Sequence, residues 1–247
     1  MTADSENISL TKVSKVALVY GNLPWLVPMM PENVAVFFKE NGILVYLKHG
    51  ETIPFGPTQK LYFVEKGLLC SLPLHQGDNT HVCGLFAQGT LLGGVMALRS
   101  PGIGHLRSMS IFGRALVATR VREITLDLFT DWFLSQPFEH QRQLYQIAIA
   151  MTECQLEGVF INDRNPVYVR LLWALEVLGQ CAVRLDKDSF VIPGGITLSD
   201  IAQIVHTNRE MVSRAFSEAQ RNEITVRRGR ELVVNEKRLL LALDALL

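Results

Sequence analysis

The fold of the C-terminal part is decided by the stretch ITLSDIAQIVHTNREMVSRAFSEAQ, residues 196–220. Thr197 and Asp200 have the spacing of a capping box, in which a hydroxyl and a carboxylate satisfy the free amides at a helix start. Apolar or small residues then recur on one face. Polar residues 206–208 interrupt this pattern, which begins again at Val212. This spacing predicts two short helices joined by a tight turn, which is a helix-turn-helix.

The second of these helices carries polar side chains that are chemically suited to reading base pairs. We expect Val212 and Phe216 to pack in the core, so other side chains face outward in the N-terminal half of this helix. In this motif, that half enters the major groove. An arginine can donate two hydrogen bonds to guanine, and a carboxylate can accept one from cytosine. The base-reading residues that we expect are Arg209, Glu210, Ser213 and Arg214. The alternative is an ordinary helical hairpin with exposed charges.

The segment ITVRRGRELVVN, residues 224–235, has two β-prone runs around a glycine, which predicts a hairpin or wing. Basic side chains at its tip would neutralise DNA phosphates and fix the register of the protein on the duplex. The residues expected to contact the DNA backbone are Thr197, Thr207, Asn208, Arg227, Arg228 and Arg230. A solvated arginine-rich turn is the alternative for the wing.

Upstream, from about residue 33 to residue 130, short apolar segments alternate with glycine and proline turns, which predicts an antiparallel barrel or sandwich. A helical period follows, whose narrow apolar seam needs a covering surface. That surface is either the chain's own barrel or a second copy, and the small Cys154 and Gly158 favour the second copy. The expected dimer seam is Leu144, Ile147, Met151, Cys154 and Gly158.

These patterns divide the chain into three expected parts. Residues 1–130 form an N-terminal extension and a β-rich sensor domain, residues 131–162 a dimerisation helix and hinge, and residues 163–247 the winged helix-turn-helix domain. The polar run that ends at Pro166 is the expected hinge, because proline suits the first turn of a new helix.

Residues 196–220 and the wing resemble the Crp/Fnr family, which includes the cyclic-AMP receptor protein and the fumarate-nitrate reduction regulator. The resemblance implies an α+β chain with a cyclic-nucleotide-binding-like β-roll (a jelly roll), a long dimerisation helix and a C-terminal winged helix-turn-helix. It further implies a bacterial transcription regulator that binds double-stranded DNA as a homodimer, with RNA polymerase as a candidate partner.

The resemblance also implies a palindromic DNA site with TGTGA- or TTGAT-like half-sites. Arg209, Glu210 and Arg214 match the base contacts of the cyclic-AMP branch, while Glu210, Ser213 and Arg214 match those of the fumarate-nitrate branch. The chain carries both sets, so the resemblance does not choose between them. His206 departs from the family, which usually has glycine at this turn.

The effector site implied by the resemblance is degenerate. The family's cyclic-nucleotide cassette has a glutamate after Gly-x-x-x-Gly, whereas this chain has Gly94 there, and the Arg-Ser pair comes about three residues late. Without the carboxylate, the ribose hydroxyl loses its acceptor. The candidate pocket is Gly93, Gly94, Arg107 and Ser108, and we expect that cyclic AMP does not control this chain.

No other cofactor is expected. The 4 cysteines include no CxxC pair and none precedes Cys70, so neither a metal site nor the family's iron-sulfur cluster is indicated. The alternative is a haem or metal site in the sensor domain, with ligands among Cys70, His75, His81 and Cys83, of which the last two are two residues apart. We regard them as ordinary loop and core residues.

Charge and hydropathy bound the remaining classes of function. With 24 basic and 24 acidic residues, a DNA-binding surface has to come from local clustering. No apolar run is long enough to span a membrane and no signal peptide is evident, so we expect a cytoplasmic protein. No nucleophile and base set points to an enzyme. The alternative function is a family-like sensor of a ligand or protein partner that has lost DNA binding.

Overall fold

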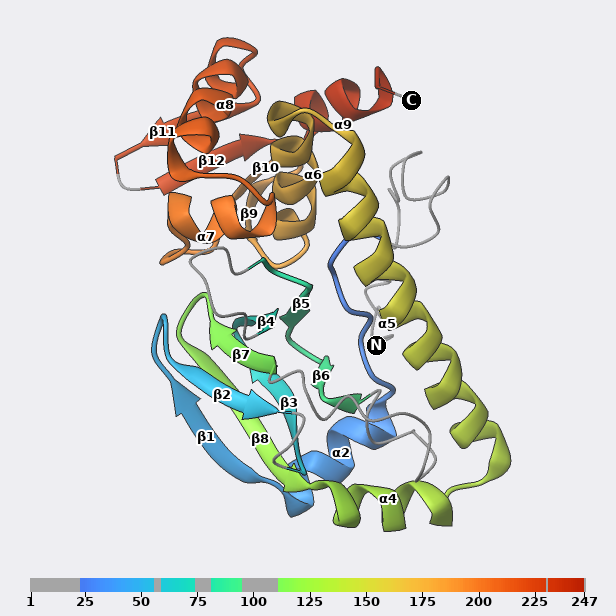
Figure 1. Ribbon diagram of the computed structural model, residues 1–247. Helices are drawn as coiled ribbons and strands as arrows, with labels where there is room; N and C mark the ends of the chain where they lie inside the picture. Colours follow the sequence, from blue (N-terminus) through green and yellow to red (C-terminus); the bar gives the residue numbers. More distant parts are fainter. Residues whose placement is uncertain (1–22, 56–58, 74–80, 95–110, 230, 247) are drawn as a thin grey trace, which may run out of the picture.

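The computed structural model describes residues 23–55, 59–73, 81–94, 111–229 and 231–246 (Figure 1). Its described part contains an N-terminal β-roll, a long helix along one side, and a smaller mixed domain at the other end of that helix. None of the helices in these ranges is long and apolar enough to cross a membrane.

The β-roll consists of two antiparallel four-stranded sheets, with the strand orders β1-β8-β3-β6 and β2-β7-β4-β5. In the strand β3, four consecutive residues from Leu61 to Val64 are buried, because the opposing sheet covers one face of the strand and helices cover the other. The strands are β1 (Ile43–Leu47), β2 (Thr52–Phe55), β3 (Lys60–Lys66), β4 (Leu68–Pro73), β5 (Gly84–Ala87), β6 (Leu91–Leu92), β7 (Ile111–Ala115) and β8 (Thr119–Thr125).

Two helices, α2 (Glu32–Asn41) and α4 (Leu126–Ser135), close the end of the roll that lies away from the smaller domain. Their aromatic side chains form one cluster, in which the rings of Phe37 and Trp132 stack with centroids 4.6 Å apart. Phe129 packs against the same rings and is 1% exposed. The β-roll therefore has its own hydrophobic core.

Helix α5 (Phe138–Arg164) is 27 residues long and runs beside the β-roll up to the smaller domain (Figure 1). The residues predicted as a dimer seam do not face solvent in this structure. Leu144, Met151 and Cys154 are at most 3% exposed and belong to hydrophobic clusters with β-roll residues, Ile147 packs against the same clusters, and Gly158 is buried. The assignment is corrected: spacings of three and four identify an apolar face, but they do not say which surface covers it.

An N-terminal strap, residues 23–31, passes between the β-roll and α5 and explains this burial. Trp25 donates its backbone N–H to the Cys154 carbonyl at 2.8 Å, and its own carbonyl accepts from Leu85 N of β5 at 2.7 Å. Its indole is 1% exposed and lies directly against Gly158, where an added Cβ would be 2.2 Å from Trp25 Cδ1. Trp25 also has a φ of 61°, a left-handed conformation that costs energy in a bulky residue.

The smaller domain is built around α6, whose residues are buried almost throughout their length. A four-stranded sheet of order β11-β12-β10-β9 and three further helices surround it, and Leu239 and Leu243 of the last helix join its core. The elements are α6 (Val167–Gly179), β9 (Val183–Asp186), β10 (Ser189–Val191), α7 (Leu198–Ile204), α8 (Arg209–Arg221), β11 (Thr225–Arg228), β12 (Glu231–Asn235) and α9 (Glu236–Asp244).

One carboxyl group is buried in this domain. Glu176 of α6 is 6% exposed, and burial, followed by the nearby Glu236 charge, raises its pKa to about 7. Its hydrogen bond from Gln180 Nε2, at 3.3 Å, only partly offsets these effects. The unfolded chain therefore releases this proton at lower pH than the folded chain does.

The first prediction concerns Gly158. Gly158→Ala should destabilise the fold by about 3 kcal/mol, because the methyl group has no space beside the buried indole. Adding Trp25→Ala should make the double variant lose less than the sum of the two single losses, measured by denaturant unfolding. Gly194→Ala is the matched control, since its Cβ would meet nothing within 4 Å. A Gly158→Ala variant that unfolds like the unmodified chain would contradict the packing described.

The second prediction concerns Glu176. Glu176→Gln should stabilise the protein above pH 7, by up to about 3 kcal/mol, because it removes the cost of a buried ionised carboxylate. With a folded pKa of about 7 and an ordinary value of 4.5, this gain should fade as the pH falls from 7 to 4.5. Unfolding at pH 8 and pH 4.5, with the exposed Glu231→Gln as control, checks it. An equal gain at both pH values would show that charge is not the cause.

Candidate nucleic-acid interface

The two short helices begin with side-chain caps. Thr197 Oγ1 accepts from Asp200 N at 3.1 Å and Asp200 Oδ2 accepts from Thr197 N at 2.8 Å, which completes the expected capping box at α7. Asn208 caps α8 by accepting the Met211 N–H at 2.9 Å. The helix-turn-helix therefore follows from local sequence signals.

The turn between α7 and α8 contains His206 in a left-handed conformation, with φ 48°. Its imidazole stacks on His81 of the β-roll, with ring centroids 4.0 Å apart, and its Nε2 lies 3.4 Å from the Val82 carbonyl oxygen. Burial, followed by the His81 charge, lowers the pKa of His206 to about 4. The ring is therefore neutral near pH 7. The sequence showed that His206 replaces the usual glycine, but it did not predict the contact with His81.

Helix α8 has a buried face and an exposed face. Val212, Ala215, Phe216 and Ala219 pack into the domain core, as the sequence predicted for the two larger ones. The four predicted base-reading residues, Arg209, Glu210, Ser213 and Arg214, are all exposed within the first two turns. Within the described part of the chain, neither arginine forms an ion pair with a carboxylate.

The wing is present as the hairpin of β11 and β12, in which Arg228 lies opposite Glu231. Gly229 at its tip has a φ of 62°, the conformation that favours glycine in a tight hairpin turn. Arg227 and Arg228 are exposed, whereas Arg230 lies outside the described residues.

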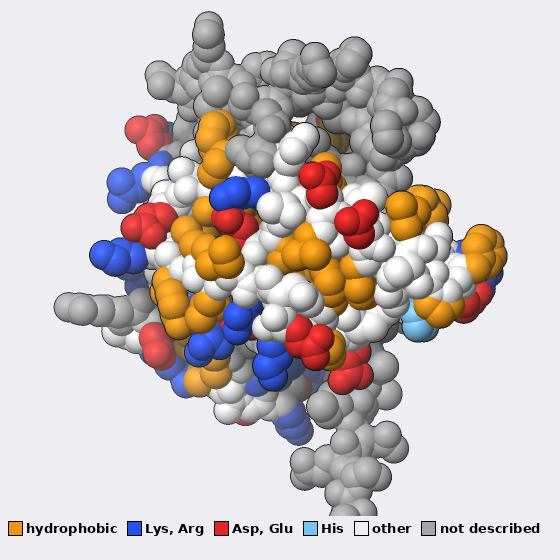
Figure 2. Space-filling view, turned by 90° about the horizontal axis from the view of Figure 1, so that it is seen from below, with side chains coloured by type: hydrophobic (Ala, Val, Ile, Leu, Met, Phe, Trp, Pro, Cys, Tyr) orange, Lys and Arg blue, Asp and Glu red, His pale blue; other side chains and the backbone are white. Residues whose placement is uncertain are grey.

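The other predicted backbone contacts surround the two helices. Thr197 and Asn208 are exposed at the starts of α7 and α8, and Thr207 is half-buried in the turn between them. The distant end of the β-roll, seen from below in Figure 2, has acidic and basic side chains interspersed with apolar ones, so basic charge is not concentrated on that face.

The effector pocket suggested by the sequence is only partly described, because Arg107 and Ser108 lie outside the described residues. Gly93 and Gly94 pack closely on leucines, since a Cβ would lie 2.9 Å from Leu61 Cδ2 at Gly93 and 3.0 Å from Leu91 Cδ2 at Gly94. Gly94 also lines a small apolar cavity of about 10 Å³, together with Met30 of the strap and Met151 of α5. That is scarcely room for one water molecule.

The histidine and cysteine side chains of the β-roll are the alternative metal or haem ligands. In the described residues, no group of three or more His, Cys, Asp or Glu is arranged to hold a metal ion. The Cys83 thiol lies 3.8 Å from the His81 carbonyl oxygen, and burial raises its pKa. Burial also raises the pKa of the Cys70 thiol to about 11, which keeps it protonated at neutral pH.

A scan against protein-family models and a search of curated proteins found no match. Solved structures match over most of the chain. FixK2 from Bradyrhizobium japonicum is 18% identical with a TM-score of 0.65, and the match covers 80% of this chain and 95% of that one. TTHA1359 from Thermus thermophilus, a transcriptional regulator of the CRP/FNR family, is 17% identical with a TM-score of 0.62, covering 82% and 98%.

A third match is the c-di-GMP responsive global regulator CLP of Xanthomonas campestris, which is 18% identical with a TM-score of 0.61 and covers 83% of this chain and 99% of that one. These matched proteins are transcriptional regulators rather than enzymes. They confirm the predicted fold class, an α+β chain with a β-roll, a long helix and a winged helix-turn-helix. The chain has the fold of the Crp/Fnr family of transcriptional regulators.

Proposed function

We propose that this chain is a sequence-specific DNA-binding transcription regulator of the Crp/Fnr type, which binds a palindromic site as a homodimer. The observation that carries the proposal is the exposed N-terminal half of α8, which presents Arg209, Glu210, Ser213 and Arg214 together. A sensor that had lost DNA binding would have no need for two exposed arginines on this face.

The chemistry of α8 suits recognition of G·C pairs in the major groove. A guanidinium donates two hydrogen bonds to guanine O6 and N7, and the Glu210 carboxylate can accept from cytosine N4. The wing arginines Arg227 and Arg228, with Thr197, Thr207 and Asn208, would hold the phosphates on either side. Half-sites of the TGTGA or TTGAT kind both fit these residues, and Ser213 completes the second set.

The surface that we assign to dimerisation is the exposed face of α5. Tyr145, Ile149, Leu156 and Val159 are 46%, 59%, 50% and 52% exposed, and their spacings of four, seven and three residues place them on one face of the helix, as in a heptad. Two copies of α5 that pack along this face would bury large side chains otherwise left in water. Their recognition helices would then be set about 34 Å apart, one turn of DNA, which accounts for a palindromic site.

Control by cyclic AMP is not part of this proposal. The cassette has Gly94 where the family has its glutamate, so a ribose hydroxyl would lack this acceptor.

The third prediction tests DNA recognition by selection of bound genomic fragments followed by titration of the selected site. Arg209→Ala and Arg214→Ala should each weaken binding about tenfold or more and relax the preference at one base pair per half-site. Arg228→Ala should weaken binding to all sequences alike and reduce the salt dependence, because it contacts phosphate. The matched control is Arg120→Ala, an exposed arginine on β8 of the β-roll, away from both α5 and α8.

Selection of no common sequence by the unmodified chain would contradict the proposal. Unchanged binding after removal of both recognition arginines would show that α8 is not the reading element.

The fourth prediction tests the dimer surface by light scattering. The unmodified chain should have twice the mass of the 27.7 kDa monomer, and Ile149→Glu combined with Leu156→Glu should yield monomers. The buried charge would have no partner in the seam. Gln143→Glu, exposed on another side of α5, is the control and should leave the dimer intact. A dimer that survives both glutamates would place the interface elsewhere.

A further inference from the structure

A hollow of about 800 Å³ lies between the β-roll and the smaller domain. Its wall on the β-roll side is built from the strap and from the turns that join β3 to β4, β5 to β6 and β7 to β8. The opposite wall is the segment from the end of α6 into β9 and the loop between β10 and α7. Small-molecule sites have volumes of about 300–1,000 Å³ and are common between domains. We call this hollow the interdomain groove; its lining includes Leu26, Lys66, Val117, Cys181 and Pro193.

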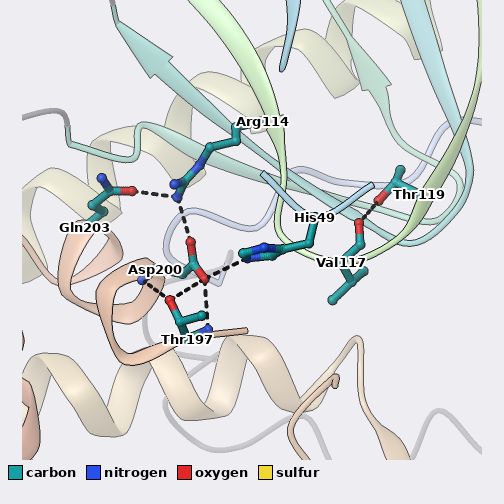
Figure 3. Close-up of polar contacts among 7 residues, drawn as sticks. All are labelled: His49, Arg114, Val117, Thr119, Thr197, Asp200 and Gln203. Carbon is teal, nitrogen blue, oxygen red and sulfur yellow. Dashed lines mark hydrogen bonds and ion pairs between the residues drawn. The ribbon is translucent and has the colours of Figure 1, made fainter. Parts of the chain in front are cut away.

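Polar contacts join the two domains and fix one of the turns that line the groove (Figure 3). Asp200 Oδ1 of α7 accepts from Arg114 Nη2 of β7 at 2.9 Å, and its Oδ2 lies 3.2 Å from His49 Nε2 in the turn after β1. Thr119 donates its Oγ1 to the Val117 carbonyl oxygen at 2.8 Å, within the turn between β7 and β8. The two walls of the interdomain groove are therefore held relative to each other by bonds outside its lining.

The lining of the interdomain groove is mainly apolar on both sides. Hydrocarbon that packs against such walls is removed from water, which is favourable in proportion to the area buried. The wall is open at Gly194, where an added Cβ would meet nothing within 4 Å. The apolar residues include Leu26, Val27 and Met29 of the strap, Val117 of the β-roll, and Val183 and Pro193 of the smaller domain.

A single charge lies in this apolar lining. Lys66, exposed at the end of β3, is the one charged residue among the described residues that line the groove. It forms no ion pair within the described ranges of the chain. An ammonium group beside apolar walls favours an anionic partner. The side-chain amide of Gln88, which also lines the groove, can donate to a second oxygen of that partner.

The number of charges favours a carboxylate as this anion. A carboxylate has one negative charge, which one lysine neutralises. A phosphate monoester has about −1.5 to −2 charges at pH 7, so part of its charge would remain without a partner beside apolar walls.

We propose that the interdomain groove binds a small amphipathic carboxylate, whose apolar body lies between the strap and the smaller domain and whose carboxylate pairs with Lys66. The groove is separate from the small cavity at Gly94, because no described residue lines both. The ligand contacts both domains, so its binding should stabilise their contact by linkage. The proposal goes beyond DNA recognition and does not depend on it.

Calorimetry with the full chain tests the class of ligand. Octanoate and 3-phenylpropanoate are the probes, and 1-octanol, octyltrimethylammonium and octyl phosphate are the comparisons, all below their micelle concentrations. At least one of the two acids should bind. 1-Octanol should bind about tenfold more weakly or worse, because it lacks the charge that pairs with the lysine. Octyltrimethylammonium should not bind, and octyl phosphate should bind more weakly than octanoate.

Alkylation of cysteines tests where the acid binds. Cys181 lines the interdomain groove and is partly exposed, whereas Cys83 is exposed and does not line it. A saturating concentration of the acid that binds should slow the reaction of Cys181 with iodoacetamide severalfold and leave that of Cys83 unchanged. Mass spectrometry follows both thiols in one sample, so Cys83 is the internal reference.

Variants of Lys66 test the ion pair. Lys66→Met should weaken binding of the acid about tenfold and leave binding of 1-octanol unchanged, because it removes the charge and keeps a long side chain. Lys66→Arg should retain binding of the acid. The matched control is Lys39→Met, an exposed lysine on α2 that does not line the groove. Thermal unfolding of each variant establishes that it is folded.

Four outcomes would overturn the proposal. These are binding of neither acid, binding of 1-octanol or octyl phosphate at least as tight as that of octanoate, unchanged binding of the acid after Lys66→Met, and binding that leaves Cys181 unprotected. Binding as expected by a chain that selects no DNA sequence would support the groove and overturn the proposed function, so the two can fail separately.

Discussion

The contact between Trp25 and Gly158 determines which face of the long helix α5 packs against the β-roll. A glycine at this position lets the indole lie directly against α5, and the strap that carries Trp25 is bonded to α5 on one side and to β5 on the other. The helix is thereby fixed to its own β-roll along the face that holds Leu144, Met151 and Cys154. In the part of the chain that the structure describes, Tyr145, Ile149, Leu156 and Val159 on the opposite face of α5 are exposed.

The strap fills most of the space between α5 and the β-roll, and it does so with local strain. It occupies the side of α5 that faces the roll, and the residual cavity near Gly94 is apolar and about 10 Å³ in volume. The indole N–H of Trp25 is buried without a hydrogen-bond partner among the described residues, and its backbone is in a left-handed conformation. Both features cost free energy. The strap is therefore held by packing and backbone bonds against local strain.

Local patterns in the sequence were sufficient for the helix-turn-helix, the wing and the sequence of domains, because caps, turns and periodicity act within a few residues. The apolar face of α5 was assigned to a second copy of the chain, whereas the strap and the β-roll cover it here. The spacing of apolar residues identifies the face but not the surface that covers it. The contacts of Asp200 with Arg114 and His49 could not be found this way, because these residues are far apart in the sequence and the capping box already accounts for Asp200. His206 alone signalled that the turn was unusual.

Asp200 shows how one side chain can join local and interdomain structure. Its carboxylate completes the capping box of α7 through Thr197 and also receives Arg114 and approaches His49. The Thr197 bonds of the cap do not involve the β-roll side chains, so the cap of α7 does not depend on the contact between the domains. The hydrogen bonds that the carboxylate accepts and the Arg114 charge offset its burial and hold the pKa of Asp200 below its usual value.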